Sequence, residues 1–192
     1  MRVSREKFAE NREKILEAAG VLFRENGFNG IGVADIMQAA GLTHGGFYGH
    51  FTSKEDLALE VSRGLIDKVE TRWKKIIADA PERPLEALLD HYLSPRSLHD
   101  PGTGCVFASL VQEVSRDDGP VRATFSEGLA SLVNLLEGIV TGETPQDRRR
   151  NAFSTLAAMM GAVIMARVAG SEEMADAFLA SMRQTLASAN GS

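Results

Sequence analysis

Hydrophobic residues recur along most of this chain at intervals of three and four, which is the spacing of one face of an α-helix. In the first such segment the apolar face comprises Ile15, Ala18, Ala19, Leu22 and Phe23, and glutamates occupy the opposite face. Period-two alternation is absent and β-branched residues are sparse, so no segment is predicted to be a strand. The pattern predicts an all-α fold of about nine helices.

Glycine, proline and capping residues set the predicted helix boundaries. The first helix is expected to end at Gly27, and a second, short helix at Gly41. Thr43 and Ser53 are N-cap candidates for the next two helices, and Asp56 suits a capping box with Ser53. The long helix from Ser53 ends near residue 80. Five more helices are predicted over residues 84–93, 104–116, 120–140, 145–168 and 171–187.

Residues 40–61, AGLTHGGFYGHFTSKEDLALEV, combine three glycines with aromatic residues just before the long helix. Two short helices joined by AGL, with the first helix completing a small core, form a helix-turn-helix. Glycines would let the second short helix bring its backbone close to DNA, although each costs about 1 kcal/mol relative to alanine. Phe47 and Phe51 are predicted to hold this helix on the core. A glycine-rich connector without a ligand is the alternative.

The stretch GFNGIGVADIMQAAGLTHGGFYGHFTSKEDLALEV resembles the DNA-binding signature of the TetR family of bacterial repressors. The resemblance covers residues 8–61 and rests on many positions at fixed spacing: G-F, D-I, A-G-L, S/T-x-G-x-F/L-Y-x-H-F and S-K-E-x-L. It implies an all-α homodimer that pairs through its last two helices. It also implies a helix-turn-helix DNA-binding domain at residues 1–53 and a helical ligand-binding and dimerisation domain at 54–192.

By position, the resemblance assigns phosphate contacts to hydroxyl, imidazole and ammonium groups. These residues are Thr43, Tyr48, His50 and Lys54. His44 is then the candidate for reaching a base edge, and Gly45 belongs to the same surface.

The chain also departs from the family pattern, because Gly46 and Gly49 stand where many members carry a side chain. Base readout is therefore expected to be sparse. DNA shape, or an N-terminal arm containing Arg2 and Arg5, is expected to supply more of the specificity.

The resemblance implies a transcriptional repressor that binds a palindromic operator in double-stranded DNA as a dimer. A small-molecule effector acting on the C-terminal domain would release the operator. A helical protein-interaction module that does not bind DNA is the rival hypothesis. The sequence identifies neither the effector nor the operator, and it leaves repression and activation both open.

The charge distribution agrees with DNA binding by the N-terminal part alone. The formal net charge of -5 argues against indiscriminate binding of nucleic acid. Residues 1–54, however, carry seven Lys/Arg and six Asp/Glu, whereas residues 55–192 carry 14 and 20. The acidic remainder of the chain would repel a polyanion.

Several other classes of protein are not predicted. No apolar run approaches the ~20 residues of a membrane helix, and the charged N-terminus is unlike a signal peptide, so we expect a cytoplasmic protein. The four histidines and single cysteine lack metal-ligand spacing, and no nucleotide-binding or hydrolase motif occurs. Neither an enzyme, a metal nor a cofactor is predicted.

Two sets of apolar residues in the C-terminal part have candidate roles. The last two helices combine apolar and small residues, which suits either an intramolecular core or the homodimer interface that the resemblance favours. The candidate interface residues are Leu156, Met160, Ile164, Phe178 and Met182. Residues suited either to an effector pocket or to a simple core are Trp73, Tyr92, Phe107, Leu110 and Phe125.

Cys105 has two interpretations. It lies at the start of a predicted helix behind two glycines, where free amides and the helix dipole lower a thiol pKa and favour the reactive thiolate. Arg96 and His99 are close in sequence and could add positive charge. The residue is thus a candidate sensor of oxidants or electrophiles, as in some relatives in the family. The alternative is a small buried apolar side chain.

Overall fold

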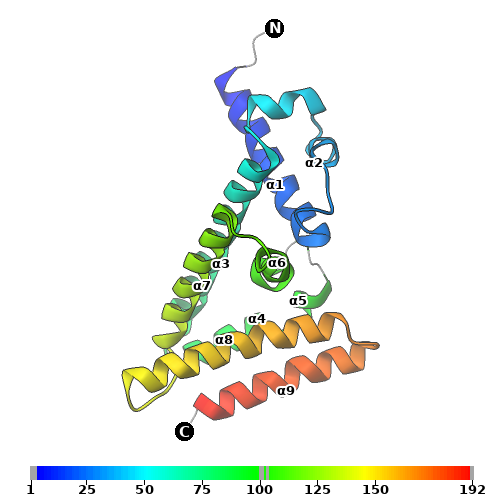
Figure 1. Cartoon of the computed structure of the whole chain (residues 1–192). Coiled ribbons are helices and arrows are strands. Elements are labelled where there is room, and N and C mark those ends of the chain that lie inside the picture. Colours follow the sequence, from blue (N-terminus) through cyan, green and yellow to red (C-terminus); the bar gives the residue numbers. More distant parts are fainter. Residues whose placement is uncertain (1–3, 100–101, 103, 191–192) are drawn as a thin grey trace. The chain divides into compact units, whose positions relative to one another are not determined.

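The computed structural model describes residues 4–99, 102 and 104–190, which form nine α-helices and one 3₁₀-helix (Figure 1). In chain order they are α1 (Arg5–Asn26), α2 (Val33–Ala39), η1 (His44–Gly49), α3 (Lys54–Asp79), α4 (Pro84–Tyr92), α5 (Arg96–His99), α6 (Val106–Val114), α7 (Pro120–Glu137), α8 (Pro145–Arg167) and α9 (Glu172–Asn190). The all-α prediction is confirmed, and all nine predicted helices are present. The additional helix, α5, is a single turn within a segment predicted to be a loop, and it is too short to show a helical period.

The described residues pack into two compact units. The first takes its residues from 1–66 and 101–125, and the second from 67–100 and 126–192. Helices α3 and α7 therefore contribute residues to both units. All of the predicted DNA-contacting residues that the structure describes belong to the first unit.

The core of the first unit joins the helix-turn-helix to α3 and α6. Ile15 and Phe23 of α1 are fully buried, as the periodicity predicted. The other largest buried side chains of this unit are Ile36, Met37, Phe47, Phe51, Leu57, Phe107 and Leu110. Helix α1 contacts both α2 and α6, and α2 contacts η1. The two short helices are thus supported by α1 on a continuous apolar core.

Two glycines in the first unit adopt a backbone conformation that other residues rarely take. Gly27, after α1, has φ +75°, and Gly41, after α2, has φ +69°. Both are the residues predicted to end those helices. At the other end of α1, the Ser4 hydroxyl accepts a hydrogen bond from the Lys7 amide at 3.2 Å and so caps the helix.

The second unit is built around the antiparallel pair α8 and α9, which lie side by side (Figure 1). Helix α4 packs on α9 and α5 packs on α8. An ion pair at 2.8 Å joins Arg183 of α9 to Asp90 of α4. The Trp73 ring stands edge-on to Tyr92 at 5.9 Å, and both side chains are buried.

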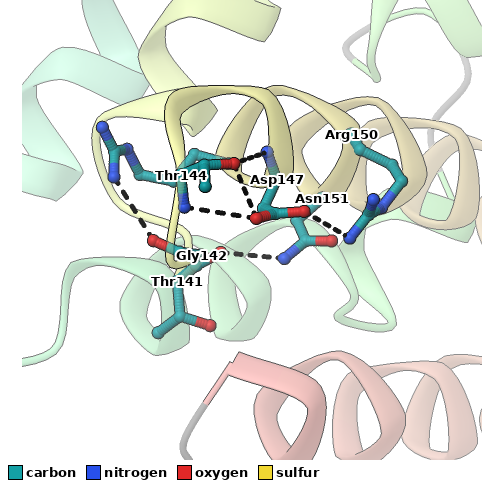
Figure 2. Close-up of polar contacts among 7 residues, drawn as sticks. Thr141, Gly142, Thr144, Asp147, Arg150 and Asn151 are labelled. Carbon is teal, nitrogen blue, oxygen red and sulfur yellow. Dashed lines mark hydrogen bonds and ion pairs between the residues drawn. The ribbon is translucent and has the colours of Figure 1, made fainter.

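The connection into α8 is held by a capping box (Figure 2). The Thr144 hydroxyl accepts from the Asp147 amide at 3.1 Å, and the Asp147 carboxylate accepts from the Thr144 amide at 3.2 Å. Arg150 pairs with the same carboxylate at 2.8 Å. Asn151 donates to the Thr141 carbonyl at 2.8 Å, which ties the preceding loop to the helix. Thr144 and Asp147 therefore cap the start of α8 reciprocally.

We expect Thr144→Ala to lower the free energy of unfolding by about 1 kcal/mol, because it leaves the Asp147 amide without its acceptor. Thr144→Ser keeps the hydroxyl and should cost less than half as much. Urea unfolding at one fixed protein concentration measures both changes. Equal losses in the two variants would show that the methyl group, and not the cap, is responsible.

Candidate DNA-binding surface

The second short helix of the helix-turn-helix is the 3₁₀-helix η1, with sequence HGGFYG. Its three glycines give it little helical propensity, so its shape depends on packing. Phe47 is fully buried and Phe51, just beyond the helix, is 2% exposed, as predicted. A side chain on Gly45 or Gly49 would meet no heavy atom within 4 Å. The segment therefore exposes backbone with few side chains, and its buried phenylalanines attach it to the core.

The predicted contact residues on this segment are exposed together. Thr43, His44 and Gly45 are all exposed, and Tyr48 is 68% exposed although its ring lies edge-on to Phe47 at 5.2 Å. Thr43 occupies the N-cap position of η1, as predicted, although its side chain makes no capping hydrogen bond. The hydroxyl is consequently not used within the helix.

His50 is less exposed than Tyr48 and Gly49. Its ring stacks on Phe8 at 4.1 Å, and its Nδ1 atom is buried without a hydrogen-bond partner among the described residues. Burial lowers the pKa of His50 below its usual value, and the Arg12 charge lowers it further. Any contact from this imidazole to a phosphate would have to use Nε2.

Arg12 of α1 contacts both Phe51 and Glu60 within the first unit. Its guanidinium lies over the Phe51 ring, 4.8 Å from the centroid, and pairs with Glu60 of α3. The roles of Phe8, Arg12 and Glu60 could not be predicted from the sequence, because they depend on contacts between different helices. Phe8 does continue the apolar face of α1, yet it is 42% exposed.

Lys54 is the first residue of α3 and is half-buried. The helix start differs slightly from the predicted capping box. Ser53 accepts from the Asp56 amide at 3.1 Å, but the Asp56 carboxylate accepts from the amide and hydroxyl of Thr52, both at 2.9 Å, and not from Ser53. Among the described residues, none forms an ion pair with Lys54.

Most basic residues of α1 are neutralised locally. Lys7 and Lys14 both pair with Glu10, at 2.9 and 2.8 Å, and these contacts lower the pKa of Glu10 to about 2, Lys14 having the larger effect. Arg5 is exposed at the start of the helix, whereas Arg2 lies outside the described residues. Neither lysine of α1 is therefore a free cation.

The candidate effector-pocket residues are buried, and they belong to different units. Trp73 and Tyr92 lie in the second unit, and Phe107, Leu110 and Phe125 lie in the first. Phe107 and Phe125 stand edge-on at 5.2 Å. Each group packs as ordinary core within its unit, and a pocket role for these residues stays a prediction.

Cys105 is the N-cap residue of α6 and is half-buried. Of its predicted cationic neighbours, Arg96 is exposed, and the His99 side chain falls outside the described part of the chain. Among all the residues that the structure describes, no group of three or more His, Cys, Asp or Glu side chains is placed to hold a metal ion. None of the helices described is long and apolar enough to cross a bilayer.

Residues 15–61 match the family described as "Bacterial regulatory proteins, tetR family", and residues 80–182 match "Tetracyclin repressor-like, C-terminal domain". The chain belongs to the TetR family. Its family is one of helix-turn-helix transcriptional regulators and not of enzymes. The resemblance seen in residues 8–61 is thereby confirmed.

Individual relatives agree with this assignment. The chain is 26% identical over 175 residues to the HTH-type transcriptional repressor DhaR of Mycobacterium sp. strain GP1, covering 88% of each protein. It is 39% identical over 77 residues to the repressor KstR2 of Mycobacterium tuberculosis, covering 40% of this chain and 38% of that one. A TetR regulator structure from Chloroflexus aurantiacus superposes with a TM-score of 0.80 at 26% identity, covering 95% of both chains.

The lowered pKa of the half-buried His50 predicts a pH-dependent stability. Because its pKa is lower in the folded than in the unfolded state, the folded protein binds fewer protons between these two pKa values. Stability should therefore fall as the pH drops through this range. We expect the wild type to lose more unfolding free energy than His50→Gln between pH 7.5 and 5, measured by urea unfolding. Parallel losses in the two proteins would contradict this account.

Proposed function

We propose that this TetR repressor contacts its operator with the exposed residues of the segment 43–50 and with Lys54. The observation that carries the proposal is the exposure of Tyr48 on a segment whose neighbouring rings, Phe47 and Phe51, are buried. A rigid base and an exposed hydroxyl suit phosphate contacts, which fix the position of a protein on the duplex. The open surface at Gly45 suits close approach of the backbone.

We further propose that the repressor acts as a homodimer that pairs through α8 and α9. Large apolar side chains on these helices are exposed in the single chain, which is typical of an interaction surface. They include Phe153, Met165, Met174 and Phe178, which are 52%, 50%, 52% and 36% exposed. Among the residues predicted from sequence, Met160, Ile164 and Met182 are partly exposed, whereas Leu156 is 3% exposed and already belongs to the core of the chain.

Release from DNA is proposed to follow binding of a small molecule to the C-terminal domain. The alternative is chemical modification of Cys105 by an oxidant or electrophile. The position of Cys105 supports this alternative, because α6, which it caps, packs against α1 of the helix-turn-helix. A bulky or charged group added there would strain the start of α6.

Operator binding can be tested with duplexes selected from a random pool by the wild-type protein. Tyr48→Phe and Lys54→Ala should each weaken binding by about 1 to 2 kcal/mol, a factor of roughly 5 to 30, on all selected sequences alike. Lys54→Ala should also reduce the salt dependence by about one unit of slope. Lys75→Ala, an exposed lysine further along α3, is the matched control and should change neither.

A changed base preference at unchanged overall affinity would refute the phosphate assignment. Binding that hardly varies with salt would refute DNA recognition itself and favour the protein-interaction module.

The Cys105 alternative predicts a difference between wild type and Cys105→Ser. Both should bind the selected duplex equally in reducing buffer. A mild oxidant or a thiol-reactive quinone should release only the wild type, because only the wild type has a thiol to modify. Equal release of both proteins, or of neither, would leave reversible binding of a small molecule as the explanation.

A further inference from the structure

Glu113, near the end of α6, binds the connection between α1 and α2 through both of its carboxylate oxygens. Oε2 accepts from the Phe28 amide at 2.8 Å. Oε1 accepts from the amide and the side-chain nitrogen of Asn29, at 3.0 and 2.6 Å. These residues are 84 and 85 positions apart in sequence, so the hydrogen bonds join two otherwise distant parts of the first unit. Hydrogen bonds to an ionised carboxylate are stronger than neutral ones.

The backbone at the end of α1 is shaped to receive this carboxylate. The Gly27 amide is bonded to the Phe23 carbonyl at 2.8 Å, which leaves the next two amides directed away from the helix. Gly27 has φ +75°, and a Cβ atom there would lie 2.6 Å from Oε2 of Glu113. Glycine is thus required at this position both for the backbone conformation and for the space that the carboxylate occupies.

The α1–α2 connection, residues 27–32, leads directly into the helix-turn-helix. At its other end, the Gly32 amide donates to Asp35 at 3.1 Å and closes the first turn of α2. Helix α2 in turn contacts η1. Fixing Phe28 and Asn29 therefore fixes where α2 begins, and through α2 the placement of η1.

The hydrogen bonds of Glu113 are more accessible to water than the apolar contacts of α6. Glu113 is half-buried and lines an open cleft of about 1000 Å³, together with Phe28, Asn29, Lys54 and Arg116. Water in this cleft can replace a lost hydrogen bond to the carboxylate. The apolar residues of α6, by contrast, are buried: Val106, Phe107, Leu110 and Val114.

We propose that Glu113 is a positioning residue for operator binding. It holds the α1–α2 connection in the conformation that presents η1 to DNA, and movement of α6 away from α1 releases the connection. Its own side chain does not touch the DNA. The effect on operator affinity rests on the DNA-binding role proposed above.

The test compares Glu113→Gln with Glu127→Gln on a duplex selected by the wild type. Both changes remove one negative charge, and simple electrostatics predicts slightly tighter DNA binding in each case. Glu127 is exposed on α7 and has no ion pair among the described residues, so its variant should follow that expectation. Glu113→Gln should instead weaken binding about tenfold, because a side-chain amide cannot accept from all three donors.

Hydrogen exchange provides a readout that distinguishes positioning from general destabilisation. In Glu113→Gln the amides of Phe28 and Asn29 should lose protection about tenfold, while those of Leu110 and Val61 keep theirs. Asn29→Ala should weaken DNA binding less when added to Glu113→Gln than when made alone, because the side-chain hydrogen bond that Asn29→Ala removes is made to Glu113.

Three results would overturn the proposal. The first is wild-type affinity in Glu113→Gln despite loss of protection at Phe28 and Asn29. The second is unchanged protection of these amides, and the third is a loss of protection spread over the whole first unit. Failure of the wild type itself to select any duplex would instead refute the proposed DNA contacts, and the role of Glu113 with them.

Discussion

Burial of Phe47 and Phe51 is the interaction on which the DNA-binding surface depends. The segment between Thr43 and His50 contains three glycines and has little tendency to form a helix by itself. Its conformation is imposed by two aromatic rings packed in the core that α1, α2 and α3 share. The exposed groups of the segment, including the Tyr48 hydroxyl, are therefore placed by residues that face the other way. A second layer of contacts, from Phe8 and Arg12, fixes the end of this segment against α1 and α3.

Much of the fold could be predicted because the relevant information is local. The apolar face of α1 and the glycines that end α1 and α2 are visible in a few consecutive residues. The 3₁₀ geometry of η1 could not be predicted. The helix has six residues and one buried side chain, Phe47, so it shows no period that would distinguish a 3₁₀-helix from an α-helix. Helix α5 has too few residues to show any period.

The site was predicted less completely, because its polar contacts join residues far apart in sequence. The exposed set around Tyr48 followed from the family signature. The ion pair of Arg12 with Glu60, and the hydrogen bonds of Glu113 to the α1–α2 connection, have no local signal at all. The spacing of apolar residues also cannot distinguish residues that line a pocket from residues of a closed core. Trp73 and Phe107 illustrate the problem, because both are large, aromatic and buried, yet they belong to different units.

The open environment of Gly49 separates the chemistry of the exposed surface from the packing of the core, which are usually linked in a folded protein. No heavy atom lies within 4 Å of the place where its Cβ would be, and its backbone angles are accessible to other residues. A side chain introduced there would extend from the exposed side of η1 without disturbing Phe47 or Phe51. The candidate DNA-binding surface can thus change its chemistry while the core stays the same. For protein engineering, Gly49 is therefore a position at which a side chain can be added to this surface without repacking the core.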